Sequence, residues 1–157
     1  MQANNIESIF NYQVLSEKLA SAGQPERDQF KQIQSAGYQV VINLAMPDSG
    51  HAIPDEASLV ESLGMEYIAI PVVWTAPQLA DLTAFFQAMD KRWDQKVFVH
   101  CAMNFRASAF IFLYRVLHQQ EALEIAREDM LEIWEPDEIW QKFIGAALEK
   151  PAGIQAS

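Results

Sequence analysis

The feature that most constrains the fold is a regular alternation of short apolar runs and longer amphipathic segments through the middle of the chain. The runs at residues 38–44, 65–72 and 96–100 have the length and apolar character of buried strands. In the segments between them, apolar residues recur at the spacing of a helix with one buried face. This order predicts an α/β protein with a mostly parallel central sheet flanked by helices.

Glycines and turn residues set the expected boundaries of these elements. Gly37 and Gly64 predict left-handed helix ends, residues 21–25 predict a turn, and Pro25 suits the first position of a helix. Because no repeat or linker divides the chain, residues 1–157 are expected to form one domain with a core at about residues 12–149, and residues 151–157 to fray. The expected strands are residues 12–15, 38–44, 65–72 and 96–100, and the expected helices are residues 25–36, 54–63, 77–93, 106–118, 121–134 and 136–149.

Composition excludes several classes of function. A formal charge of −10 argues against nucleic acid and anionic lipid as partners, because both attract basic surfaces. No apolar run approaches the roughly 18 residues that a membrane-spanning helix needs. A single cysteine permits neither an internal disulfide nor a thiolate-only zinc site, and the histidines His51, His100 and His118 have no metal-ligand spacing. We therefore expect no metal and no cofactor.

The beginning of the chain bears on the compartment. Its first residues lack the charged and apolar regions of a signal peptide. The expected compartment is the cytoplasm, with the periplasm as the alternative if a leader has been removed.

The one cysteine lies where parallel sheets bind ligands, beyond the carboxyl end of a strand. Cys101 follows the strand at residues 96–100, and a helix is expected from Arg106, so the residues between them form a tight loop. The N–H groups of such a loop and of the first helical turn lack intrahelical partners, and with the helix dipole they form an anion site. The same field favours the thiolate form of the cysteine, and the planar fork of the arginine matches phosphate or sulfate oxygens. The predicted anion-binding loop consists of Ala102, Met103, Asn104, Phe105 and Arg106.

Three residues around this loop keep two interpretations each. Cys101 is either a nucleophile aimed at a bound oxyanion or a small buried hydrophobe, and its position favours the nucleophile. His100 either orients the loop through a hydrogen bond or is a core histidine. Trp74, which follows the strand at residues 65–72, either stacks on a substrate ring or packs in the core.

The stretch VFVHCAMNFRASAF, residues 97–110, resembles the signature loop of cysteine-dependent protein tyrosine and dual-specificity phosphatases. The wider chain is similar to a bacterial phosphatase-like family of unknown function, related to the phosphatase-like domain of beta-lactamase-hydrolase-like proteins. The resemblance runs from about residue 12 to residue 148, through SAGQP, AGYQVVINLA, YIAIPVVW and WEPDEIWQKFI. It implies a single-domain protein tyrosine phosphatase-like fold of the dual-specificity type, with Cys101 as nucleophile and Arg106 as phosphate clamp.

The loop departs from the phosphatase pattern in its length. Four residues separate Cys101 from Arg106, whereas the phosphatases that it resembles have five. Either the loop is one residue short and Arg106 keeps the usual place, or Ala107 takes that place and Ser108 falls where phosphatases carry a hydroxyl that bonds the thiolate. Asn104 stands near the usual loop glycine, and asparagine tolerates a left-handed backbone.

A second departure concerns the general acid. Phosphatases place an aspartate after the preceding strand to protonate the leaving oxygen, but residues 72–76 contain no carboxylate. Asp48 and Asp81 are the candidate substitutes, and each also fits a solvated loop or helix start. The sequence thus predicts a weak cysteine-dependent phosphatase of small-molecule or protein phosphate monoesters. One alternative is a non-catalytic phosphate-binding module. The other is a rhodanese-like sulfurtransferase, because rhodaneses also have four residues between their cysteine and arginine.

Overall fold

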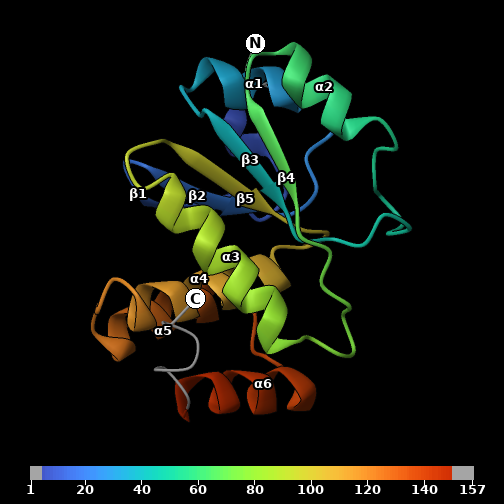
Figure 1. Ribbon diagram of the computed structural model, residues 1–157. Helices are drawn as coiled ribbons and strands as arrows, with labels where there is room; N and C mark the ends of the chain where they lie inside the picture. The colour runs from blue at the N-terminus through green and yellow to red at the C-terminus, as the bar shows by residue number, and fades with distance from the viewer. Residues whose placement is uncertain (1–4, 150–157) are drawn as a thin grey trace.

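Five short strands form one sheet in the computed structural model, which describes residues 5–149 (Figure 1). The order across the sheet is β1-β2-β5-β3-β4, with β1 antiparallel to β2 and the other neighbours parallel. Strand β5 is therefore central, and its carboxyl end lies between those of β2 and β3. The strands are β1 Gln13–Ser16, β2 Leu19–Ala22, β3 Val40–Asn43, β4 Glu66–Ala69 and β5 Val97–His100.

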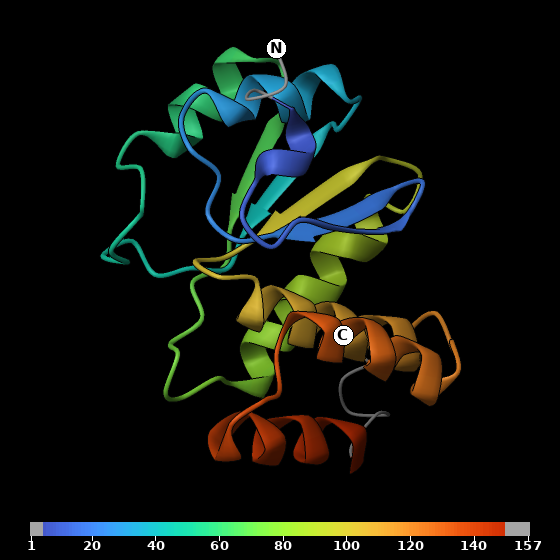
Figure 2. The ribbon, with the colours of Figure 1, turned by 180° about the vertical axis from the view of Figure 1, so that it is seen from behind.

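Six helices cover the two faces of the sheet (Figures 1 and 2). The short helices α1 (Gln29–Ser35) and α2 (Glu56–Ser62) pack on one face, and the longer four on the other. Because side chains alternate along a strand, Phe98 of β5 packs in the core under α1 and α2, while Val97 and Val99 pack in the core under the longer helices. The longer helices are α3 (Leu79–Lys91), α4 (Phe105–Leu117), α5 (Leu123–Ile133) and α6 (Glu138–Glu149).

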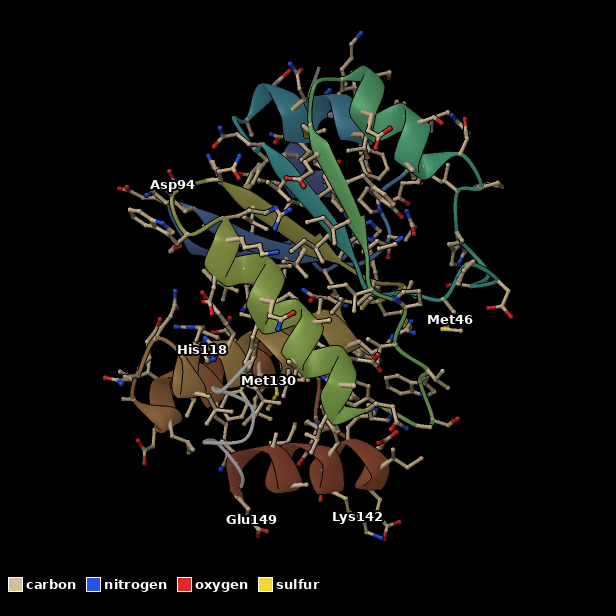
Figure 3. The ribbon with its side chains drawn as sticks, viewed as in Figure 1. Met46, Asp94, His118, Met130, Lys142 and Glu149 are labelled. Carbon is tan, nitrogen blue, oxygen red and sulfur yellow. The ribbon has the colours of Figure 1, made fainter. Side chains whose placement is uncertain are left out.

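Helix α4 is the central helix of the larger layer. Every residue from position 106 to position 115 is buried, which agrees with a sequence that is apolar on nearly all sides. Helices α5 and α6 pack against it, and α6 turns Lys142 and Glu149 away from the sheet (Figure 3). Enclosure on all sides fixes the start of α4, and therefore Arg106, beside the end of β5.

The predicted α/β class and mostly parallel sheet are confirmed, and each expected helix and strand is present. Most have shorter ends, whereas β1 begins and ends one residue later than expected and α4 one residue earlier. Gly37 and Gly64 have the predicted positive φ angles, 97° and 85°. One element was missed: Ser21 and Ala22, expected in a turn, belong to β2. Its sequence LASA lacks β-branched residues, so its strand form depends on pairing with β5, which the local pattern does not reveal. The expected frayed end at residues 151–157 lies outside the described residues.

Candidate active site

Cys101 is the first residue after β5, and it is 1% exposed. It lies at the bottom of a cavity of about 300 Å³ at the carboxyl ends of the parallel strands. The predicted nucleophile and clamp, Cys101 and Arg106, therefore border the same space. The lining residues are Trp74, Cys101, Ala102, Met103, Phe105 and Arg106.

The carbonyl groups of the loop after Cys101 form hydrogen bonds with residues that do not line this cavity. Each carbonyl from Cys101 to Phe105 meets a donor, and none of the donor residues lines the cavity. In a trans peptide the N–H points opposite to the carbonyl, and the described residues contain no cis bond. The loop N–H groups outside the bridge between Gly23 and Met103 are therefore the candidates to bind an anion. The donors are His100 Nδ1 at 3.2 Å, Gln24 N at 2.9 Å, Asn11 Nδ2 at 2.9 Å, Ser108 N at 2.9 Å and Ser108 Oγ at 3.0 Å.

Asn104 has a left-handed conformation, with φ 72°, which asparagine tolerates. It is completely buried, and its side-chain amide donates to Asn11 O at 2.9 Å and to Ser21 Oγ at 3.0 Å. Asparagine thus supplies both the turn that glycine would allow and a hydrogen-bonded anchor that glycine lacks.

Arg106 enters the cavity from the first turn of α4. The residue is 7% exposed, and its guanidinium donates from Nη1 to Val72 O at 2.8 Å and lies 5.9 Å from the centre of the Trp74 ring. Among the described residues it has no carboxylate partner, so most of its N–H donors remain available for a ligand. Ala107 is buried and does not border the cavity.

Trp74 forms the aromatic wall of the cavity. Its ring lies 5.4 Å from Trp134, 5.7 Å from Trp140 and 6.1 Å from Phe105, measured between ring centres. Its carbonyl accepts a hydrogen bond from Trp140 Nε1 at 2.9 Å. The ring therefore packs in an aromatic cluster and also borders the cavity, and stacking on a substrate stays a prediction.

His100 is completely buried beneath the loop. Its Nε2 lies 2.6 Å from Glu56 Oε2, and its Nδ1 lies 3.2 Å from Cys101 O. The sequence left open whether this histidine orients the loop or fills the core, and its position does both. Glu56 was not recognisable from the sequence, because 44 residues separate it from His100 and only the packing of α2 on the sheet joins them.

The remaining sequence candidates do not border the cavity. Ser108 Oγ donates to Phe105 O at 3.0 Å, and Asp48 is exposed in the loop after β3. Asp81 accepts the Gln78 N–H at 3.3 Å at the start of α3. Burial raises the pKa of Asp81, which the hydrogen bond from Gln78 partly offsets. Within residues 5–149, no carboxylate lines the cavity of Cys101.

Two further properties concern the described part of the chain as a whole. Residues 5–149 contain no group of three or more histidine, cysteine, aspartate or glutamate side chains arranged to hold a metal ion. None of the helices within this range has the length and apolar character that crossing a membrane requires.

A solved structure decides the family. The "Putative phosphatase (DUF442)" of Shewanella putrefaciens CN-32 is 36% identical, with a TM-score of 0.84 over 96% of this chain and 98% of that one. This chain belongs to the DUF442 family. Among curated proteins, the Beta-lactamase hydrolase-like protein of Xylella fastidiosa (strain Temecula1 / ATCC 700964) is 31% identical over 106 residues, or 66% of this chain. The DUF442 chain spans 24% of that relative. No family model matches the present chain.

More distant structures share the fold of this DUF442 protein. Kinase associated phosphatase, with its catalytic-site cysteine replaced by serine, is 13% identical with a TM-score of 0.77 over 92% of this chain and 97% of that one. A cysteine-to-serine variant of P. aeruginosa TpbA in complex with phosphotyrosine is 16% identical, with a TM-score of 0.71 over 94% and 89%. The protein thus has the protein tyrosine phosphatase-like fold that the sequence predicts.

Proposed function

We propose that this protein is a cysteine-dependent phosphatase of phosphate monoesters, with Cys101 as the nucleophile. The observation that carries the proposal is the loop whose carbonyls are all bonded away from the cavity, beside a buried arginine with no carboxylate partner. Arg106 supplies N–H donors and a positive charge at this cavity, which suits the three equatorial oxygens of a phosphoryl group. The thiol of Cys101 lies at its base.

In the proposed reaction, the Cys101 thiolate attacks phosphorus and forms an S–P bond while the ester P–O bond breaks. The alcohol leaves with the bonding electrons and takes up a proton. Water then attacks the phosphothiol, releases inorganic phosphate and restores the thiolate. Arg106 and the loop amides hold the phosphoryl oxygens in both steps.

The proton for the leaving alcohol limits this reaction. Protonation by a positioned acid contributes about a hundredfold or more to rates of this kind, and no described carboxylate lines the cavity. Asp81 is the better of the two candidates, since burial already raises its pKa and it lies at the start of the helix that follows Trp74. Weak turnover follows, faster for aryl than for alkyl esters because a phenol leaves more easily without a proton.

The test is hydrolysis of p-nitrophenyl phosphate by the natural protein and by Cys101→Ser. We expect slow turnover that the substitution abolishes, and a covalent phosphoryl group on Cys101 when the natural protein is quenched by acid and examined by mass spectrometry. Turnover that survives in Cys101→Ser would contradict the proposed nucleophile.

The second candidate function is a non-catalytic phosphate-binding module. The absence of a carboxylate from the described cavity lining favours it, because binding needs the amides and Arg106 but no acid. This function predicts that phosphate or vanadate binds to the protein and protects Cys101 from alkylation while no ester is hydrolysed. Turnover in the range of efficient phosphatases would rule it out.

The compartment of the protein and the class of its substrate are part of the same proposal. A nucleophilic thiolate has to stay reduced, which suits the cytoplasm better than the periplasm. With a formal charge of −10, the protein is expected to act on soluble phosphate esters, small or protein-bound, and not on nucleic acid or membrane surfaces. Fractionation of cells that produce the protein tests the compartment.

A further inference from the structure

Glu56, the first residue of α2, is a charged side chain that the proposed reaction does not use. It is 2% exposed, although glutamate is seldom buried without partners. Both carboxylate oxygens are engaged: Oε2 lies 2.6 Å from His100 Nε2, and Oε1 accepts from Gln24 Nε2 at 3.0 Å. This degree of burial and bonding indicates a specific structural task.

Both partners of Glu56, His100 and Gln24, also contact carbonyl groups of the Cys101 loop. His100 Nδ1 lies 3.2 Å from Cys101 O, and the backbone N–H of Gln24 donates to Ala102 O at 2.9 Å. The Glu56 carboxylate is thus linked through His100 to the carbonyl of Cys101 and through Gln24 to the carbonyl of Ala102. Glu56, His100 and Gln24 are called the Glu56 network below.

The chemistry of these atoms fixes where the protons are. A carbonyl oxygen only accepts, so the contact between His100 Nδ1 and Cys101 O requires a proton on Nδ1. The contact between Nε2 and Glu56 Oε2 holds one further proton, on the ring or on the carboxyl group. These contacts are directional, so they fix the ring of His100 relative to the Cys101 carbonyl.

We propose that Glu56 is a positioning residue that keeps the carbonyls of Cys101 and Ala102 turned away from the anion cavity. Released from the network, these carbonyls are free to rotate toward the cavity, where their negative ends oppose both an anion and the thiolate. The inference rests on the proposed function for its purpose. The orientation of the loop, however, can be measured without any turnover.

The measurement is the rate at which iodoacetamide alkylates Cys101 at pH 7. Glu56→Leu removes both hydrogen bonds and keeps the side chain's bulk, and we expect alkylation to slow by about tenfold, below the roughly hundredfold that a displacement of about 1 Å costs a reaction. Glu56→Gln restores the network, because its oxygen accepts from Gln24 and its NH₂ donates to a neutral His100 Nε2. We expect this variant to stay within about twofold of the natural alkylation rate, because both hydrogen bonds of residue 56 are kept.

Val60→Ala is the matched control, because Val60 lies one turn further along α2, is fully buried and has no polar contact with the loop. It should lower the melting temperature and leave the alkylation rate unchanged. A natural rate in folded Glu56→Leu would overturn the proposal, as would a Glu56→Gln variant as slow as Glu56→Leu. If Glu56→Leu does not fold, Gln24→Ala decides: slower alkylation supports the network, and an unchanged rate overturns it.

The same experiment separates this proposal from the proposed function. If the natural protein neither hydrolyses p-nitrophenyl phosphate nor binds phosphate, the function fails while the alkylation rates still judge Glu56. If the natural protein is active and Glu56→Leu matches it in both alkylation and hydrolysis, the positioning role fails alone.

Discussion

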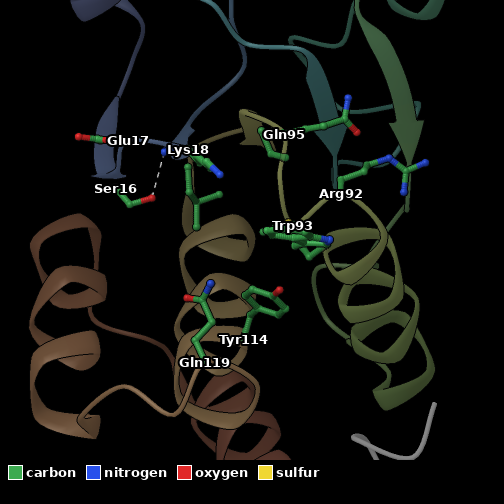
Figure 4. Close-up of a pocket in the computed structure, with 11 residues that line it drawn as sticks. Ser16, Glu17, Lys18, Arg92, Trp93, Gln95, Tyr114 and Gln119 are labelled. Carbon is green, nitrogen blue, oxygen red and sulfur yellow. Dashed lines mark hydrogen bonds between the residues drawn. The ribbon is translucent and has the colours of Figure 1, made fainter.

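The two ends of the sheet each carry a cavity with an arginine and a tryptophan, yet they are built differently. At the carboxyl ends of the strands, Arg106 and Trp74 border the 300 Å³ cavity of Cys101. At the opposite end, Arg92 and Trp93 border an open groove of about 410 Å³ between the β1–β2 turn and the ends of α3 and α4 (Figure 4). Size and residue type alone do not tell these two sites apart.

The difference lies in what satisfies each arginine. Arg92 is bound by Glu66, with Arg92 Nε 2.9 Å from Glu66 Oε1, and Trp93 is 74% exposed. Arg106 is 7% exposed and meets only a carbonyl and an aromatic ring. Burying a cation without a carboxylate is costly, so Arg106 is where we expect an anion to bind. A buried, uncompensated charge is thus a better mark of a functional site than a hollow.

The largest effect expected from this contrast is on Arg106. Arg106→Ala removes the phosphoryl clamp and should lower kcat/KM for p-nitrophenyl phosphate by about a hundredfold to a thousandfold, the scale of losing one donor to a developing charge. Arg92→Ala is the matched control at the other end of the sheet and should change kcat/KM by less than about twofold. Equal losses in the two variants would erase the distinction between the two ends.

The length of the Cys101 loop offers a gain of function. A glycine inserted between Asn104 and Phe105 restores five residues between Cys101 and Arg106 and widens the cradle. Since a displacement of about 1 Å can cost about a hundredfold in rate, we expect turnover to rise by up to that factor and to vanish again with Cys101→Ser. An insertion variant that folds, binds phosphate as before and stays slow would point to the missing acid as the limiting defect.

A smaller effect is expected where β2 approaches the loop. A Cβ on Gly23 would lie 2.8 Å from both Ala102 O and a Phe10 ring carbon, closer than the backbone can accept. Gly23→Ala should therefore reduce the free energy of unfolding by about 1–3 kcal/mol, the usual cost of overpacking. Gly50→Ala meets no atom within 4 Å and should leave urea unfolding unchanged. Equal midpoints for the two variants would mean that the loop is not held tightly at Gly23.

The smallest effect concerns the ion pair in the open groove. The hydrogen bond from Arg92 lowers the pKa of Glu66 below 4.5, so the stability it gives is present above that pH and lost as the pH falls through the lowered pKa. Because Glu66 is about half exposed, Glu66→Gln should cost less than about 1 kcal/mol at pH 7 and nothing at pH 2. Equal unfolding free energies for both proteins at pH 7 would show that solvent cancels the pair.

Local pattern was sufficient for most of the fold and for the centre of the site. The strand and helix periods, Gly37 and Gly64, and the His-Cys-loop-Arg order each depend on residues close together in the sequence, so a single stretch reveals them. The sequence indicated only that Asn104 tolerates a left-handed backbone, and its φ is 72°. The loop's role in binding an anion stays a prediction that the experiments above test.

What the tertiary structure decided is the set of contacts that crosses the chain. The strand form of β2, the hydrogen bonds from Gln24 and Asn11 to the loop, and the pairing of Glu56 with His100 join segments from 44 to 92 residues apart. None of these residues has a distinctive local pattern, because each acquires its role only when α2 and β2 pack beside β5. The sequence by itself determined where the proposed nucleophile lies, and packing at long range decided how its loop is held.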